Sequence, residues 1–208
     1  MKKRICVIGA CNLDLVGRCD HDYRPGDASE GRYRLQSGGV GRNLAQGLHQ
    51  AGHVVDFVSV LGEDIFGEIL EKELQEQSFS FHKVSRPRSD LFLGLEKQDG
   101  ELFGALADMQ GIEDLGFSEL PHELLDQADA LVLDCCLSEE LLGQLCTHYG
   151  AIPIYVDGVS IDRVGRIRPF LEHVHLLKIN RAELISLTAL DHIDQALEEL
   201  LQQGLGGI

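Results

Sequence analysis

The chain has 208 residues, of which 44% are hydrophobic and 25% charged, a composition typical of one globular domain. Its formal net charge of −16 at pH 7 disfavours binding to nucleic acid or to an anionic membrane surface, because both require a basic field. The six cysteines form no C-x-x-C pair, so buried, reduced thiols are expected. No apolar run is long enough for a signal peptide or a membrane span, and we therefore expect a cytoplasmic protein.

Strand and helix patterns alternate along most of the chain. In the first half, we expect strands at 5–10 and 32–35, a helix at 41–51, a strand at 54–61, a helix after Gly62 and a strand at 79–84. In the second half, strands at 130–135, 152–156 and 174–179 alternate with helices at 138–148, 162–172 and 181–188, and a last helix follows at 192–203. Repeated strand–helix units imply an α/β fold with a mostly parallel sheet and helices on both faces.

Residues 89–107 interrupt this alternation. Two apolar runs, at 91–95 and 102–106, flank the segment Gln98-Asp99-Gly100-Glu101. Asp-Gly between apolar runs is a strong hairpin signal. Together with the exposed strand at 32–35, this hairpin predicts a small antiparallel β piece that forms a flap.

The run Ser37-Gly38-Gly39-Val40-Gly41-Arg42-Asn43 is the most informative stretch of the chain. Glycine lets the backbone bend sharply and approach a ligand closely. Because a helix is expected directly after these glycines, the free N–H groups of its first turn face a polar or anionic ligand. The turn is therefore predicted to hold a ligand.

Polar side chains collect at the predicted carboxyl ends of the strands, where open α/β sheets bind ligands. These side chains are Asn12 and Asp14 after the first strand, and Asp134, Asp157, Lys178, Asn180 and Glu183 after later strands. Each one alone is more often a helix cap, and Asp134, which precedes Ser138, is interpreted as such a cap. Their accumulation on one edge favours a site that binds polyol hydroxyls and holds water around Mg²⁺.

Other motif classes fit less well. The G-x-G at 39–41 lacks the third glycine of a dinucleotide fingerprint and follows a polar segment, so a Rossmann dehydrogenase is not expected. The sequence contains no G-x-x-x-x-G-K-[ST], which excludes a P-loop enzyme, and no H-E-x-x-H among its nine histidines.

The chain resembles the ribokinase-like, or PfkB, carbohydrate kinase family. Residues 38–45, followed by Gly52 and Gly62, match the family's N-terminal signature at every fixed position. The segments 62–67 and 178–183 are similar to the family's G-x-D-x-F-G and K-P-N-x-x-E, with isoleucine in place of the usual proline. Within the family, the residues at 108–109, 137–140 and 156–160 are similar to those of pseudouridine kinases.

The resemblance implies ATP-dependent phosphorylation of a hydroxyl of a sugar or nucleoside, most similar to pseudouridine, with ATP and Mg²⁺ as cofactors. It implies one kinase domain over 1–208, with lid segments at about 15–37 and 89–108 through which a homodimer can form. The implied substrate-binding residues are Asn12, Asp14, Gly38, Gly39, Gly41, Arg42, Asn43 and Asp108. The implied metal and phosphate residues are Asn180, Glu183 and Asp157, and Lys178 is implied to contact the nucleotide.

The family's second glycine-rich loop, D-T-x-G-A-G-D, carries the catalytic base in its last residue. No Gly-Ala-Gly-Asp occurs among these 208 residues. The resemblance therefore implies that the C-terminal part of the fold is missing, assigns no catalytic residue, and predicts an inactive chain. Two alternatives stay open: a non-catalytic protein that binds a sugar or nucleoside, and a gene fragment with no function of its own.

Overall fold

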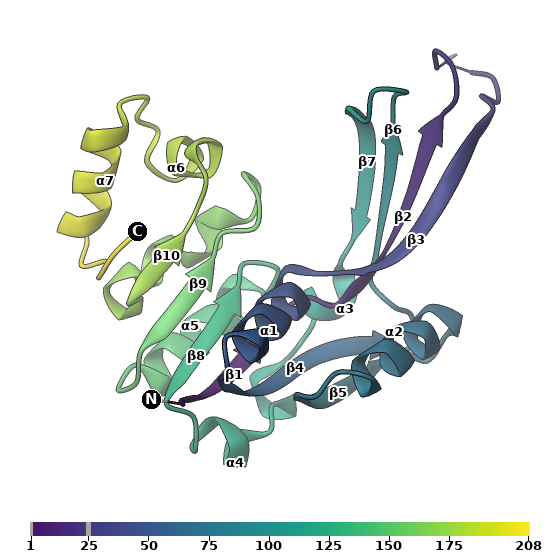
Figure 1. Ribbon diagram of the computed structural model, residues 1–208. Coiled ribbons are helices and arrows are strands. Elements are labelled where there is room, and N and C mark those ends of the chain that lie inside the picture. Colours follow the sequence, from purple (N-terminus) through teal and green to yellow (C-terminus); the bar gives the residue numbers. More distant parts are fainter. Residues whose placement is uncertain (1, 24–25) are drawn as a thin grey trace.

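The structure, a computed structural model, describes residues 2–23 and 26–208 and contains two sheets (Figure 1). The larger sheet has six strands in the order β10-β9-β8-β1-β4-β5, and every neighbouring pair is parallel. Its strands are β1 (Arg4–Ile8), β4 (Val54–Gly62), β5 (Ser80–Arg86), β8 (Ala130–Asp134), β9 (Ile154–Asp157) and β10 (Leu176–Lys178). The predicted α/β class with a parallel sheet is confirmed.

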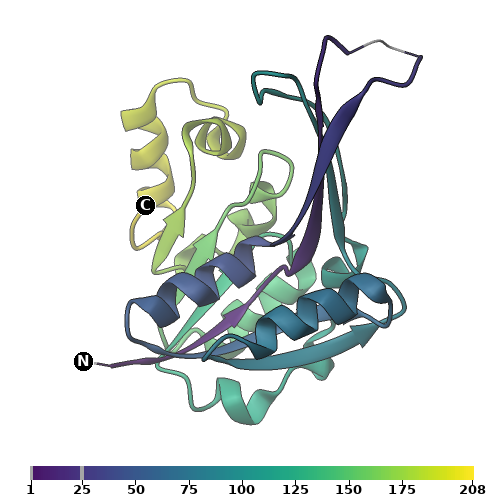
Figure 2. The same cartoon turned by 45° about the vertical axis from the view of Figure 1, so that its right-hand side comes forward.

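Helices cover both faces of the parallel sheet (Figures 1 and 2). α1 (Val40–Gln50) and α2 (Ile65–Gln75) lie on one face, and α5 (Glu139–Tyr149) lies on the other. The remaining helical elements are α3 (Gln110–Glu113), η1 (Phe117–Glu119), α4 (His122–Leu125), η2 (Val164–His173), α6 (Arg181–Thr188) and α7 (Ile193–Gln202). In β1, Val7 joins the apolar cluster under α1 and α2, while Ile8 joins the cluster that includes α5. Burial on both faces explains why this strand is a continuous apolar run.

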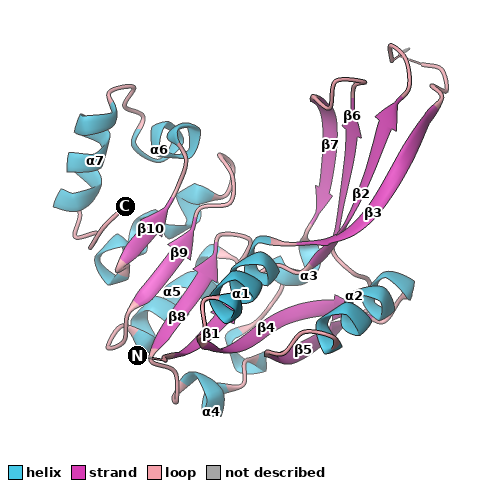
Figure 3. Cartoon of the chain, in the orientation of Figure 1, coloured by secondary structure: helices cyan, strands magenta, loops and turns pink. Residues whose placement is uncertain are grey.

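The second sheet, called the lid from here on, has four strands in the order β3-β2-β6-β7. They are β2 (Asn12–Cys19), β3 (Gly31–Gly38), β6 (Leu91–Glu96) and β7 (Leu102–Asp108). Figures 1 and 3 show the lid projecting from the parallel sheet at the point where β1 leads into β2. The hairpin predicted at 91–106 is the antiparallel pair β6–β7; β2 and β3 are also antiparallel, and a parallel pairing of β2 with β6 joins the two pairs.

Three local predictions need correction. β1 ends at Ile8, so Asn12 and Asp14 do not end the first strand but begin β2, a strand that the polar composition around 18–37 concealed. The exposed strand predicted at 32–35 is longer, because β3 pairs with β2 along its whole length. The helical stretch expected at 162–172 is a 3₁₀ segment with non-helical backbone at Phe170, next to Pro169.

All six cysteines are buried and unpaired, as expected. Burial raises the pKa of the Cys6 and Cys11 thiols to about 12. Thiols with such pKa values are unreactive at neutral pH, because the thiolate is the reactive form. In the part of the chain that the structure describes, no helix is long and apolar enough to cross a membrane.

Candidate active site

The first residues of β2 place two polar side chains beside the glycine turn. Asn12 Nδ2 donates a hydrogen bond to Asp14 Oδ1 at 2.7 Å. Asn12 is the register partner of Gly38, and a Cβ on Gly38 would collide with the Asp14 carboxylate. Asp14 has a partly exposed side chain. An amide and a carboxylate held together in this way can pair with the hydroxyls of a polyol.

The glycine turn presses against the segment that connects β1 to β2. Gly39 has a φ of 100°, and a Cβ at this position would collide with the Ala10 carbonyl oxygen. Arg42 N donates to the same Ala10 oxygen at 3.1 Å. Arg42 Nη1 donates to Asn43 Oδ1 at 3.0 Å, so the two side chains stay together in the first turn of α1. The predicted turn leading into a helix is confirmed, with α1 beginning at Val40.

Asp134 lies under this turn and does not cap the helix that follows it. Ser138 caps α5 instead, accepting from Leu141 N at 3.1 Å. Asp134 is fully buried, and its carboxylate accepts from Ala10 N at 2.8 Å and from Cys136 N at 3.0 Å. Burial raises the pKa of Asp134 to about 6, against the opposing effect of these N–H donors. The interpretation as a cap was wrong, and an ionisable residue at the end of a buried strand was the signal for its role.

The remaining polar residues form a second group at the ends of β9 and β10. Lys178 Nζ lies 3.0 Å from Asp157 Oδ2, with 67% of the lysine side chain exposed and 6% of the aspartate side chain exposed. Asn180 and Glu183 form a capping box at the start of α6, in which Asn180 N donates to Glu183 Oε2 at 2.9 Å. A Cβ on Gly158 would lie 3.3 Å from Glu183 Oε2, so the loop after β9 packs closely on this box.

The same loop contains a strained residue. Val159 has a φ of 66°, in the left-handed region that β-branched residues rarely adopt. Its backbone N donates to Asp157 Oδ1 at 2.9 Å. Strain of this kind persists where the surroundings fix the backbone, and it is often found at ligand sites.

Asp108, a further predicted residue, belongs to neither of these two groups. In the lid register it pairs with Leu91, which pairs in turn with Leu13. Neighbouring residues of a strand point to opposite faces of a sheet, and Leu13 is next to Asp14 in β2. Asp108 therefore lies on the face of the lid opposite to that of Asp14. The carboxylate of Asp108 lies 3.6 Å from Arg88 instead.

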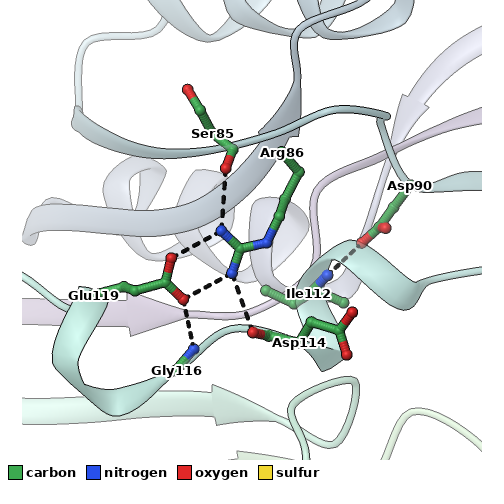
Figure 4. A network of polar contacts seen from close by, with 7 residues as sticks. All are labelled: Ser85, Arg86, Asp90, Ile112, Asp114, Gly116 and Glu119. Atoms are coloured by element: carbon green, nitrogen blue, oxygen red, sulfur yellow. Dashed lines mark hydrogen bonds and ion pairs between the residues drawn. The ribbon is translucent and has the colours of Figure 1, made fainter.

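The base of the lid is anchored to the segment that follows it (Figure 4). Arg86, at the end of β5, donates to both carboxylate oxygens of Glu119 at 2.9 and 2.8 Å, and to the Asp114 carbonyl at 3.1 Å. Asp90 accepts from Gly111 N at 2.8 Å and from Ile112 N at 3.0 Å, which ties β6 to α3. Neither Arg86 nor Asp90 was singled out from the sequence.

The segment similar to G-x-D-x-F-G joins the lid to α2. Asp64 caps α2 by accepting from Gly67 N at 2.9 Å, and it also accepts from Ser89 N at 2.8 Å and Ser89 Oγ at 2.6 Å. A side chain on Gly62 would collide with the Ser89 backbone. These hydrogen bonds outweigh the effect of partial burial and lower the pKa of Asp64.

An apolar groove of about 410 Å³ lies beside α1 on the parallel sheet. Its lining includes Ile5, Leu44, Leu48, Val132, Tyr155 and Leu176, and it reaches Asp157 and Lys178 of the second group.

Comparison with known proteins agrees with this architecture. The chain is 29% identical over 194 residues to the pseudouridine kinase of Escherichia coli, covering 91% of this chain and 62% of that protein. It is 31% identical over 209 residues to the E. coli protein named uncharacterized sugar kinase YeiI, covering 96% of this chain and 58% of that protein. The chain therefore spans about three fifths of the length of these two relatives.

Solved structures share the fold over the whole chain. A carbohydrate kinase from Agrobacterium tumefaciens superposes with a TM-score of 0.88 at 25% identity, covering 100% of this chain and 69% of the other. A ribokinase from Thermotoga maritima superposes with a TM-score of 0.86 at 18% identity, covering 98% and 69%. The sequence pattern of pfkB family carbohydrate kinases matches residues 2–206. With a parallel sheet, a projecting lid and the glycine turn between them, the chain belongs to the pfkB family of carbohydrate kinases.

Proposed function

We propose that the chain binds the hydroxyls of a sugar or nucleoside through Asn12, Asp14 and the glycine turn, as the acceptor-binding part of an ATP-dependent kinase. The observation that carries this proposal is the Asn12–Asp14 pair, hydrogen-bonded at 2.7 Å and packed against Gly38. Arg42 and Asn43 lie in the adjoining turn and add further donors and acceptors. Asp108 is not included in this proposed contact, because it lies on the face of the lid opposite to that of Asp14.

We infer a nucleoside similar to pseudouridine as the acceptor. The E. coli relative at 29% identity and an Arabidopsis thaliana relative at 24% identity are both named pseudouridine kinase. A third relative, from Exiguobacterium acetylicum, is 26% identical over 147 residues and is named guanosine-inosine kinase. Nucleosides are thus the shared substrate class in the names of these three relatives.

ATP and Mg²⁺ are proposed to meet the second group. Among residues 2–23 and 26–208, no set of three or more His, Cys, Asp or Glu side chains is arranged to hold a metal ion alone. Mg²⁺ commonly keeps several waters and takes one or two carboxylates together with phosphate oxygens. Asp157 and Glu183 fit such a role through water, and the exposed Lys178 ammonium fits a phosphate. Bound Mg²⁺ would neutralise part of the negative charge of the phosphates.

We propose further that these 208 residues bind the acceptor without turning it over. No residue of the chain is assigned as the general base, and loss of a general base alone lowers a rate by about 10²–10⁴-fold. Steady-state assays with ATP, Mg²⁺ and pseudouridine test this point. Turnover at ordinary kinase rates would contradict it.

Calorimetry with pseudouridine and with ribose, without ATP, tests acceptor binding. Asp14→Asn is expected to weaken binding about 10- to 100-fold, since it removes a charge-assisted hydrogen bond to a ligand hydroxyl. Glu198→Gln is the matched control, because it removes the same charge from an exposed position on α7. Equal affinities for all three proteins would reject Asp14 as a contact, and no binding by the unmodified chain would reject the function.

We also propose a homodimer formed by one face of the lid. The register places Leu15, Leu35, Leu93 and Leu106 in one row across all four strands, and Leu35 and Leu106 are 45% and 59% exposed. Exposed apolar rows of this kind are typical of interaction surfaces. Light scattering is expected to report a dimer for the unmodified chain and a monomer for Leu106→Glu. Leu201→Glu, which changes a 50% exposed leucine of α7, should remain dimeric.

A further inference from the structure

The carboxylate of Asp134 joins several parts of the proposed acceptor site from beneath. Oδ2 accepts from Ala10 N at 2.8 Å, and Oδ1 accepts from Cys136 N at 3.0 Å. The side chain is fully buried, so it does not reach a ligand itself. Any effect of Asp134 on binding must therefore pass through the backbone that it holds.

The first turn of α1 lies beside this carboxylate. Its N-cap is Gly39, which offers no side chain, and the turn contains no acidic residue. The amino end of a helix has unsatisfied N–H groups and a partial positive charge. Asp134 lies close to this turn, because one Cβ placed on Gly9 would meet both Asp134 Oδ2 and the Gly41 Cα. A residue at the end of β8 thus places a carboxylate beside a helix start that has no side-chain cap of its own.

Two glycines let these parts fit together. A Cβ on Gly9 would collide with Asp134 Oδ2, and a Cβ on Gly41 would lie 2.6 Å from the Gly9 carbonyl carbon. Ala10 is held on both sides, because its N–H donates to Asp134 and its carbonyl accepts from Arg42 N at 3.1 Å. The spacing between the β1–β2 connection and the first turn of α1 is therefore fixed by Asp134.

We propose that Asp134 is a positioning residue for the acceptor, which holds Asn12 and Asp14 at the right spacing from Asn43. This inference rests on the acceptor function proposed above. Displacement of groups that orient a substrate lowers binding and rate strongly, even when the displaced backbone moves by about 1 Å.

The test compares Asp134→Asn with Asp129→Asn. The first variant keeps the shape of the side chain but directs an NH₂ group at a backbone N–H. Asp129 is the matched control, since it precedes the same strand and accepts from Arg4 N at 2.8 Å at the opposite end of β1. We expect Asp134→Asn to bind pseudouridine about 10-fold more weakly or worse. We also expect faster amide hydrogen exchange at 9–14 and 39–45, with both properties unchanged in Asp129→Asn.

Each outcome decides the proposal. The proposal is overturned if Asp134→Asn keeps wild-type affinity for pseudouridine and wild-type hydrogen exchange. It is also overturned if Asp129→Asn loses as much affinity as Asp134→Asn, or if exchange in Asp134→Asn rises as much in α5 as at 9–14 and 39–45. If the unmodified chain binds neither pseudouridine nor ribose, the acceptor function fails, and exchange at 9–14 and 39–45 alone decides the role of Asp134. If Asp134→Asn does not fold, Gly41→Ala displaces the turn while leaving Asp134 in place, and wild-type affinity in that variant overturns the proposal.

Discussion

Gly39 and Gly47 belong to the same segment of chain but meet different surroundings. Gly39 has a φ of 100° and no room for a Cβ beside Ala10, whereas a Cβ on Gly47 would have no atom within 4 Å. Gly39→Ala is expected to cost more than about 1 kcal/mol of stability, because both the backbone and the contact resist it. Gly47→Ala is expected to add up to about 1 kcal/mol within a helix. Thermal melting should therefore shift in opposite directions, and shifts of the same sign would contradict the close packing of the turn.

The carboxyl group of Asp90 makes stability depend on pH. Burial raises its pKa from 3.8 to about 6, although N–H donors from Ile112 and Gly111 act in the opposite direction. The folded protein therefore binds this proton more tightly than the unfolded chain. The stabilisation is complete below about pH 4 and is lost as the pH rises through about 6, which amounts to about 3 kcal/mol.

Asp90→Asn should remove this loss of stability at rising pH. The free energy of unfolding, measured by urea denaturation at pH 4 and at pH 7, is expected to differ less in the variant than in the unmodified chain. An unchanged difference between the two pH values would show that Asp90 titrates in its ordinary range.

At the scale of elements, the sequence predicted those strands that are continuous apolar runs. β1, β4, β8 and β9 are buried on both faces, so their apolar runs were visible without knowledge of their neighbours. β2 was missed because it carries Asn12, Asp14, Gly17 and Arg18 and leads into a polar segment, so only its pairing with β3 and β6 identifies it as a strand. The role of Asp134 was missed because its partner Ala10 lies 124 residues away, and spacing along the chain does not reveal such a bond.

α2 and the lid meet at a hydrogen-bonded joint that can be tested separately. Ser89 Oγ donates to Asp64 Oδ1 at 2.6 Å and accepts from Gly62 N at 3.1 Å. Ser89→Ala leaves both groups without this partner and is expected to cost about 1–3 kcal/mol. Hydrogen exchange should also increase at the start of β6. Ser80→Ala, at an exposed position of β5, is the control, and equal destabilisation by both changes would argue against the joint.

At the scale of the whole molecule, the two faces of the parallel sheet are covered unequally. The apolar groove beside α1 leaves Leu176 40% exposed. We expect an environment-sensitive apolar dye to bind there, because open apolar surface of this kind attracts such ligands. Leu176→Lys should reduce dye fluorescence, while Ile193→Lys, at a 44% exposed position on α7, should not. Equal reduction by both variants would place the dye elsewhere.

The burial of every native thiol makes this chain a convenient subject for single-molecule work. Because all six cysteines are enclosed, thiol-directed dyes should ignore them at neutral pH. Asp99→Cys at the tip of the β6–β7 hairpin and Asp162→Cys in the loop after β9 would then be the two labelled positions, without prior removal of the native thiols. Energy transfer between the two dyes would report whether the distance between the lid and the parallel sheet changes when a nucleoside is added.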